Sequence, residues 1–214
     1  MAYNIQTIKD FGDGWIVDAA HRFPCTKSST YLAAPSLIVL HWTAAPKLTI
    51  EKNRDRIRNW AARDSDKSST HLSILRDGSV WQLVPLTRAA WHAGKSSWVT
   101  ANGKPVPPSG TAGVNRYSIG IDFDLVGPVS KIDDMWFDSY NNKFDGDVEY
   151  DAKTKRWYEL PTPEAMMACR MVLDQLRRMF PAIDVRDIVG HQDVSPGRKI
   201  DPGPFINRTT LGLE

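Results

Sequence analysis

An apolar run early in the chain predicts a buried β-strand. Residues 36–42, SLIVLHW, follow Pro35 and precede a turn-like TAAP segment, and short bounded runs of this kind are typical of strands. Strand alternation places Leu37, Val39 and His41 on one face. We therefore expect His41 at the point where the strand leaves the core.

Three further segments carry strand patterns. Residues 71–84 contain two apolar runs around an Asp-Gly pair at positions 77–78, a strong short-range signal for a β-hairpin. Residues 117–127, YSIGIDFDLVG, alternate between apolar and polar positions. Residues 184–190, DVRDIVG, predict a last short strand that leads directly into His191.

Two segments show the apolar spacing of amphipathic helices. Residues 49–64 begin with Thr49 as a candidate N-cap, and their interleaved basic and acidic side chains are expected on a solvated face. Residues 160–180 begin with Thr162 as N-cap and Pro163 at the first helical position, followed by an apolar stripe. Both stripes predict helices that pack on a sheet.

The segment 130–160 follows neither pattern. It is aromatic and acidic, and it contains turn-forming sequences such as NNKFDGD and DAKTKRW. We expect a surface insertion there, formed by a hairpin or a long loop. The rest of the sequence has no internal repeat or interdomain linker, so it predicts one mixed α/β (α+β) domain over residues 1–214, with a central mixed β-sheet flanked by helices.

Composition and charge narrow the possible partners. Hydrophobic residues make up 42% and charged residues 24% of the chain, which is ordinary for a globular protein. The formal net charge of +2 is too even to indicate a nucleic-acid or membrane partner. The N-terminal residues lack the pattern of a signal peptide, and no stretch approaches the roughly 20 apolar residues that span a bilayer. We expect cytoplasmic synthesis and no membrane anchor.

Candidate chemistry lies at the ends of the predicted strands. His41 and His191 each end an apolar strand, and Asp201 follows in the proline-rich loop HQDVSPGRKIDPGP. Prolines reduce the entropy that is lost when such a loop is fixed. Two neutral imidazoles and one carboxylate suit Zn²⁺ and leave the fourth tetrahedral position for water. Taken alone this pattern is weak, because histidines at strand ends are more often packing groups than ligands.

Four motifs, in order along the chain, carry a family resemblance. They are IVLHWTAAP, STHLSILRDGSVWQLVPLTRAAWHAG, NRYSIGIDFDLVG and GHQDVSPGRKIDPGP. Together they resemble the zinc-dependent N-acetylmuramoyl-L-alanine amidases of the type-2 family, which are related to phage lysozyme-amidases and peptidoglycan-recognition proteins. The resemblance covers a catalytic core of about residues 24–206. It implies a mixed sheet with flanking helices, one zinc ion, and cleavage of the amide between N-acetylmuramic acid and L-alanine of the stem peptide.

The resemblance also assigns residues to roles. It implies His41, His191 and Asp201 as zinc ligands and Lys199 as the group that stabilises the oxyanion of the tetrahedral intermediate. A catalytic carboxylate is expected in the SIGI strand. This chain has Asp122 where many relatives carry glutamate, so the shorter acid is the first candidate for that role, with Asp124 as the reserve.

Four more residues are candidates for substrate contact. Trp91 and His92, in the AWHAG sequence, match a segment that borders the substrate cleft in relatives. Asn115 and Thr43 are polar groups that we also expect to face substrate. For each of them an ordinary structural role is the competing interpretation, and for His71 a packing role is the favoured one.

Three other classes of protein are considered. Relatives that bind peptidoglycan without cutting it lack a zinc ligand, whereas all three ligand positions are filled here. A cysteine endopeptidase needs a reactive thiolate, but Cys25 and Cys169 are expected to be reduced, structural residues. A serine triad is also excluded, because His191, Asp193 and Ser195 are loop neighbours and cannot converge as nucleophile, base and orienting group.

The biological setting is the least determined expectation. The loop at 96–116 and the insertion at 130–160 are extra material that a polymeric substrate would favour, so we expect an endolysin-like cell-wall hydrolase. It would be a monomer that acts on peptidoglycan in the periplasm after release or export. The alternative is a cytosolic amidase that recycles anhydromuropeptides, because RAAWHAG and RKIDPGP resemble that branch closely. An exported toxin is also considered.

Overall fold

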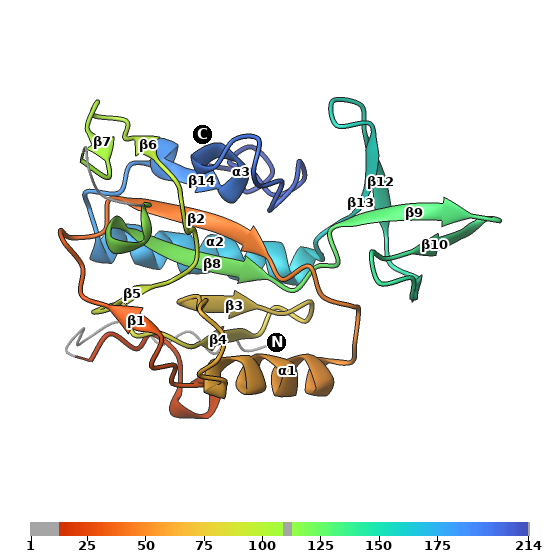
Figure 1. The fold of residues 1–214 in the computed structure, drawn as a ribbon, viewed down its shortest axis with the longest axis horizontal. Helices are drawn as coiled ribbons and strands as arrows, with labels where there is room; N and C mark the ends of the chain where they lie inside the picture. The colour runs from red at the N-terminus through yellow and green to blue at the C-terminus, as the bar shows by residue number, and fades with distance from the viewer. Residues whose placement is uncertain (1–12, 109–112, 214) are drawn as a thin grey trace.

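A five-stranded mixed β-sheet forms the centre of the structure (Figure 1). The computed structural model describes residues 13–108 and 113–213. The strands of the sheet lie side by side in the order β14 (Ile188–Gly190), β2 (Leu37–Trp42), β8 (Ser118–Phe123), β3 (Leu72–Ile74) and β4 (Val80–Gln82). The first four are parallel, and β4 runs antiparallel to β3 as the predicted hairpin. The expected mixed sheet is confirmed.

Both faces of this sheet are buried, which explains why β2 is almost wholly apolar. Ile38 and Leu40 enter the core layer that contains α2 (Pro163–Met179), whereas Leu37 and Val39 pack on the opposite face. His41 continues the second face, as strand alternation predicts. The strand therefore delivers one polar side chain at the end of an apolar run.

The two long helices begin at the predicted caps. In α1 (Ile50–Ala62) the Thr49 hydroxyl accepts the Lys52 N–H, and in α2 the Thr162 hydroxyl accepts the Ala165 N–H. In Figure 1, α2 lies along the central sheet and α1 lies beside β4. No helix among the residues that the structure describes is long and apolar enough to cross a membrane.

A second five-stranded sheet occupies the region expected to be a hairpin or long loop. Its order is β11 (Lys143–Phe144), β10 (Met135–Phe137), β9 (Pro128–Ile132), β13 (Arg156–Glu159) and β12 (Val148–Asp151), with antiparallel neighbours throughout. Asp133 and Asp134 form its first turn with φ of 45° and 62°, as a tight two-residue hairpin requires. Figure 1 shows this sheet, the extension (residues 128–159), projecting away from the core.

The remaining elements are short and border the central sheet. They are η1 (Ala19–His21), β1 (Ser28–Ser29), β5 (Ala89–Ala90), β6 (Trp98–Val99), β7 (Pro105–Val106), η2 (Asn115–Tyr117), η3 (Val185–Asp187) and α3 (His191–Val194). Two segments in this part of the structure place residues beside the functional site. Residues 91–95 follow β5 and pass beside the ends of β2 and β14, and η2 leads into β8.

Candidate metal centre

Three ligand-forming side chains meet at the carboxyl ends of the parallel strands. His41 is near the end of β2, His191 follows β14 directly, and Asp201 lies in the loop after α3. The Nδ1 atoms of the two imidazoles are 3.0 Å apart, and each is 3.0 Å from Oδ2 of Asp201. Strand topology thus joins residues that are far apart in the sequence into one cluster, which we call the metal centre.

Burial and the contacts among the three side chains shift the pKa values of His41 and Asp201 in the metal centre. Its three residues are 5%, 3% and 8% exposed, in sequence order. Burial lowers the pKa of His41, although Asp201 opposes this shift. Burial raises the pKa of Asp201, but the two imidazoles beside it outweigh this effect and hold the pKa well below its usual range. A neutral imidazole beside an ionised carboxylate is the protonation state that metal binding needs.

The outer nitrogen of His191 is fixed by the backbone. Its Nε2 lies 3.0 Å from the carbonyl oxygen of Ala93. Because a carbonyl oxygen can only accept, Nε2 carries the proton and Nδ1 faces the metal centre with a lone pair. The Arg198 guanidinium donates to the same carbonyl at 2.7 Å and to the Lys95 carbonyl at 2.7 Å. Sequence reasoning missed Arg198, although it lies in the RKIDPGP motif.

The metal centre fits a divalent metal ion. His191 Nδ1 and Asp201 Oδ2 are both acceptors, yet they face each other at 3.0 Å. Two imidazoles and one carboxylate, with ligand atoms all within 4.8 Å of one another, form the donor set of many catalytic zinc sites. The Ala93 carbonyl, which accepts the Nε2–H of His191, is a contact of the kind that orients metal-binding imidazoles. The residues present therefore suit the zinc ion that the sequence predicts.

Asp122 lies next to the metal centre on β8. The register of the parallel pair places it opposite His41. Burial raises the pKa of Asp122 to about 7, against a lowering effect of a hydrogen bond with Thr70, and the charge of Asp201 raises it further. A carboxyl that titrates near neutral pH beside such a centre suits a general base.

Lys199 lies in the loop that carries Asp201. Its side chain is partly buried, and its positive charge contributes to the lowered pKa of His41. The ammonium is thus close enough to act on the metal centre electrostatically. The role of Lys199 at the oxyanion stays a prediction.

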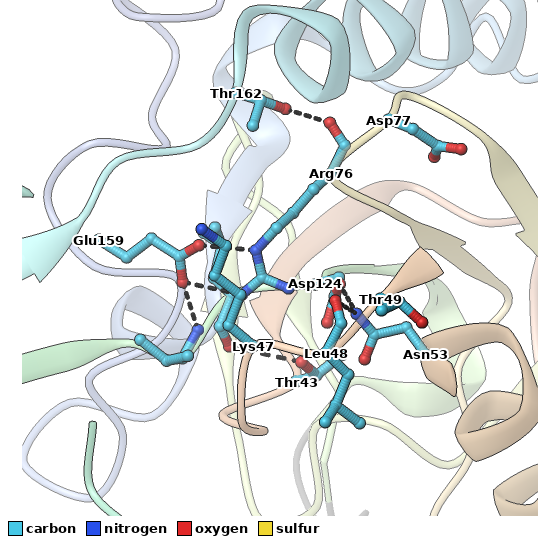
Figure 2. Close-up of polar contacts among 12 residues, drawn as sticks. Thr43, Lys47, Leu48, Thr49, Asn53, Arg76, Asp77, Asp124, Glu159 and Thr162 are labelled. Carbon is cyan, nitrogen blue, oxygen red and sulfur yellow. Dashed lines mark hydrogen bonds and ion pairs between the residues drawn. The ribbon is translucent and has the colours of Figure 1, made fainter. Parts of the chain in front are cut away.

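Asp124, the reserve candidate for the catalytic acid, belongs to a separate group of charges. It accepts hydrogen bonds from Arg76, from Arg56 at 2.9 Å and from Asn53 at 2.6 Å, and its side chain is 0% exposed. Figure 2 shows Arg76 between Asp124 and Glu159. Arg76 donates to both carboxylate oxygens of Glu159, at 2.8 and 3.0 Å.

We call these five residues the arginine cluster. Each oxygen of the Asp124 carboxylate accepts from at least one cationic or amide donor, which holds this carboxylate within the arginine cluster. These contacts favour a structural role for Asp124, and the choice between Asp122 and Asp124 as the catalytic acid stays a prediction.

His92 and Asn115 are also bound by protein groups. Nδ1 of His92 lies 2.9 Å from His41 Nε2, and its Nε2 lies 3.0 Å from Ser118 Oγ. Oδ1 of Asn115 accepts the backbone N–H groups of His92 and Ala93 at 3.2 and 2.7 Å. These contacts favour a supporting role for both residues over the predicted contact with substrate. The sequence alone does not reveal these supporting contacts, because their partners come from distant parts of the chain.

Trp91 and Thr43 remain accessible. Trp91 is 36% exposed, and its Nε1 donates to Ser29 Oγ at 3.3 Å. Thr43 is partly buried and donates to the Leu125 carbonyl at 3.4 Å. Their contact with substrate stays a prediction. His71, in contrast, is buried with its Nδ1 accepting the Gly120 N–H at 2.9 Å, and burial lowers its pKa to about 4, as a packing role requires.

Comparison with known proteins decides the family. The family model Amidase_2, described as N-acetylmuramoyl-L-alanine amidase, matches residues 31–204. This range contains the whole metal centre together with Asp122 and Lys199. The chain belongs to the N-acetylmuramoyl-L-alanine amidase family.

Relatives of this amidase include enzymes of known name. The chain is 27% identical over 210 residues to 1,6-anhydro-N-acetylmuramyl-L-alanine amidase AmpD of Enterobacter cloacae. The aligned region covers 91% of this chain and 89% of that protein. The chain is 29% identical over 127 residues to N-acetylmuramoyl-L-alanine amidase AmiD of Escherichia coli, covering 59% of this chain and 34% of that one. A crystal structure of an AmpD derivative shares the fold, with a TM-score of 0.58 at 23% identity over 94% of this chain and 96% of that chain.

The geometry disfavours the two rival nucleophiles. Cys169 is 0% exposed in α2, and burial raises the pKa of both Cys169 and Cys25, so neither thiol is poised as a thiolate. Ser195 donates its hydroxyl to the Lys95 carbonyl at 2.9 Å, and Asp193 accepts the Gly190 N–H at 2.7 Å. Both side chains are thus engaged away from His191 and do not form a triad.

Proposed function

We propose that this amidase hydrolyses the amide bond between anhydro-N-acetylmuramic acid and L-alanine in soluble muropeptides. The observation that carries the proposal is its similarity to the Enterobacter cloacae enzyme of that name over 89% of that enzyme's length. This reverses the order of the sequence-based expectations, which placed an endolysin-like hydrolase first and a recycling amidase second. A soluble substrate also removes the need for export to the cell wall.

We assign His41, His191 and Asp201 as the ligands of one zinc ion. Zinc bound by such a set lowers the pKa of water to about 7 and polarises a carbonyl group. The ionised Asp201 supplies negative charge to the site, and the Ala93 carbonyl keeps the lone pair of His191 directed inward. The fixed loop and strand ends hold these donors before substrate arrives.

Two further residues would act on the substrate. Asp122, opposite His41, would accept a proton from the attacking water and pass it to the leaving amine of L-alanine. Lys199 would stabilise the negative charge that develops on the amide oxygen in the transition state. We also propose that Trp91, with its exposed ring, and Thr43 contact the muramyl peptide.

A second candidate substrate is polymeric peptidoglycan, as the endolysin-like expectation requires. The observation that favours it is an aromatic group on the extension. Trp157 lies 5.0 Å from Trp136 and 5.2 Å from Tyr150, measured between ring centroids, and Tyr150 and Trp157 are 44% and 39% exposed. Exposed aromatic rings of this kind can pack on sugar rings of a glycan strand.

Rates on two substrates separate the candidates. The enzyme would be assayed for release of stem peptide from a purified soluble anhydromuropeptide and from purified sacculi, at equal concentrations of stem peptide. We expect rapid turnover of the soluble substrate and slow turnover of sacculi, with Trp157→Ala altering neither. Faster turnover of sacculi that is lost in Trp157→Ala would favour the polymer instead. No release from either substrate would contradict the proposed function.

A further inference from the structure

A chain of hydrogen bonds runs outward from His41 to the backbone. His41 Nε2 lies 2.9 Å from His92 Nδ1, His92 Nε2 lies 3.0 Å from Ser118 Oγ, and Ser118 Oγ lies 2.8 Å from the Val114 carbonyl oxygen. Ser118 is 0% exposed, so no water competes for its hydroxyl. We propose that His92 and Ser118 are positioning residues that set the tautomer of His41 and so present its Nδ1 to the metal.

The direction of these hydrogen bonds follows from the carbonyl at the outer end. A carbonyl oxygen only accepts, so the Ser118 hydroxyl proton points to Val114. The Ser118 oxygen then accepts the Nε2–H of His92. A neutral imidazole has one N–H, so Nδ1 of His92 is an acceptor and takes the Nε2–H of His41. Nδ1 of His41 is left with a lone pair directed into the metal centre.

Packing holds the His92 ring in the orientation that this relay needs. A Cβ atom on Gly120 of β8 would lie 2.6 Å from Cγ of His92, so the ring lies directly on the glycine backbone. Asn115 fixes the backbone on either side of the ring through the N–H groups of His92 and Ala93.

The same dipeptide therefore orients both histidine ligands. The His92 ring takes the outer proton of His41, and the Ala93 carbonyl takes the outer proton of His191. Three acceptor atoms, two Nδ1 and Oδ2 of Asp201, then face one another at 3.0 Å. Such a set favours a cation at its centre. Outer contacts that fix metal-binding imidazoles in this way typically contribute 10–100-fold to metal affinity.

The inference rests on the proposed zinc centre but not on the choice of substrate. Its test is the zinc dissociation constant of the folded, full-length protein, measured by competition with a chromophoric chelator. We expect Ser118→Ala and His92→Phe to bind zinc about 10–100-fold more weakly. Ser118→Thr, which keeps the hydroxyl, and His92→Gln, whose amide oxygen can accept the His41 proton, should recover part of the affinity. Tyr31→Phe removes another buried hydrogen bond, to His71 at 2.9 Å, and should leave the affinity unchanged.

A second measurement does not depend on any variant. Long-range ¹H–¹⁵N correlation spectra of the metal-free wild-type protein report which ring nitrogen of each histidine carries the proton. We expect the Nε2–H tautomer for both His41 and His92. Nδ1–H tautomers at both residues, or wild-type zinc affinity in Ser118→Ala and His92→Phe, would overturn the inference. A wild-type protein that binds no zinc at all would overturn the zinc centre itself, which is a distinguishable result.

Discussion

The metal centre and the arginine cluster adjoin the same end of β8. Asp122 of this strand lies next to the metal centre, and Asp124, just after the strand, belongs to the arginine cluster. Asp124 is enclosed by two guanidinium groups and an amide, with its side chain fully buried. Asp122, two residues earlier, has no arginine hydrogen-bonded to it among the described contacts, and burial raises its pKa to about 7. In the arginine cluster, both oxygens of each carboxylate accept hydrogen bonds, whereas the metal centre brings together acceptor atoms with no donor hydrogen between them.

This difference distinguishes a buried polar site that stabilises the fold from one that can carry out a reaction. Buried charges whose partners are complete hold elements together. Through Arg76 and Glu159 the arginine cluster ties the turn after β3 to β13, the strand that returns from the extension. A buried site with converging acceptors and a carboxyl that titrates near neutral pH can bind a cation and move a proton instead. The two sites therefore should respond differently to substitution.

Loss of a metal ligand should have the largest effect on catalysis. We expect His41→Ala, His191→Ala and Asp201→Ala each to lose stoichiometric zinc and to fall below detectable amidase activity, because each removes one of three protein ligands. Metal analysis and stem-peptide release check this. As the matched control in the other site, Asp124→Asn should keep its zinc. A ligand variant that retains both zinc and turnover would break the proposed assignment.

Loss of the central arginine should mainly affect stability. Arg76→Met leaves the buried carboxylates of Asp124 and Glu159 without their shared partner. Removing one partner of a buried ion pair typically costs about 3–5 kcal/mol, so we expect a decrease of that size in the free energy of unfolding from urea titration. The folded fraction should keep full zinc content. An unchanged unfolding midpoint would show that the cluster does not stabilise the fold.

Removal of the Lys199 ammonium should slow the reaction without loss of metal. We expect kcat/KM of Lys199→Ala to fall by about 100-fold or more, because an oxyanion donor typically contributes that much. Lys95→Ala, at an exposed lysine in the adjacent segment, is the matched control and should retain its rate. Turnover of Lys199→Ala at the rate of the control would remove the assigned role.

A pH-dependent change in stability is expected at Asp122. The folded-state pKa of about 7 exceeds the ordinary value of about 3.9, so the folded protein binds this proton more tightly than the unfolded chain. Its contribution to stability is fully present below about pH 4 and is lost as the pH rises to about 7. We expect metal-free Asp122→Asn to match the wild-type Tm near pH 4 and to exceed it near pH 8.

The same variant should bind zinc and turn over slowly, because it lacks the proposed base. Asp124→Asn gives the contrast, since it removes the carboxylate that pairs with Arg56 and one of the two that pair with Arg76, and it should lower Tm at both pH values. A Tm difference for Asp122→Asn that does not change with pH would contradict the raised pKa.

The sequence predicted the parts of the fold that depend on local patterns. The strand at 36–42, the Asp-Gly hairpin and the Thr49 and Thr162 caps are all confirmed, because periodicity and cap chemistry are properties of neighbouring residues. The convergence of His41 with His191 followed from strand ends that share one edge of a parallel sheet. The five strands of the extension were missed, because strands of two to five residues between tight turns leave little periodic signal.

The polar partners around the site were not predictable from the sequence in the same way. His92 and Asn115 were expected to contact substrate, but their hydrogen bonds go to His41 and to the backbone after β5. The strand pattern places Asp124 on the same face as Asp122, but its arginine partners come from a helix and a turn elsewhere in the chain, so the sequence does not reveal them. Such roles depend on which side chains the tertiary fold brings within hydrogen-bonding distance.

The central claim is that the metal centre holds the zinc ion on which amidase activity depends. The most direct test is to remove metal from the purified protein with a chelator and to titrate Zn²⁺ back while stem-peptide release from a soluble anhydromuropeptide is measured. We expect loss of activity when zinc is removed and full recovery at one equivalent of zinc, but no recovery in Asp201→Ala. Full activity of protein shown to be metal-free would contradict it.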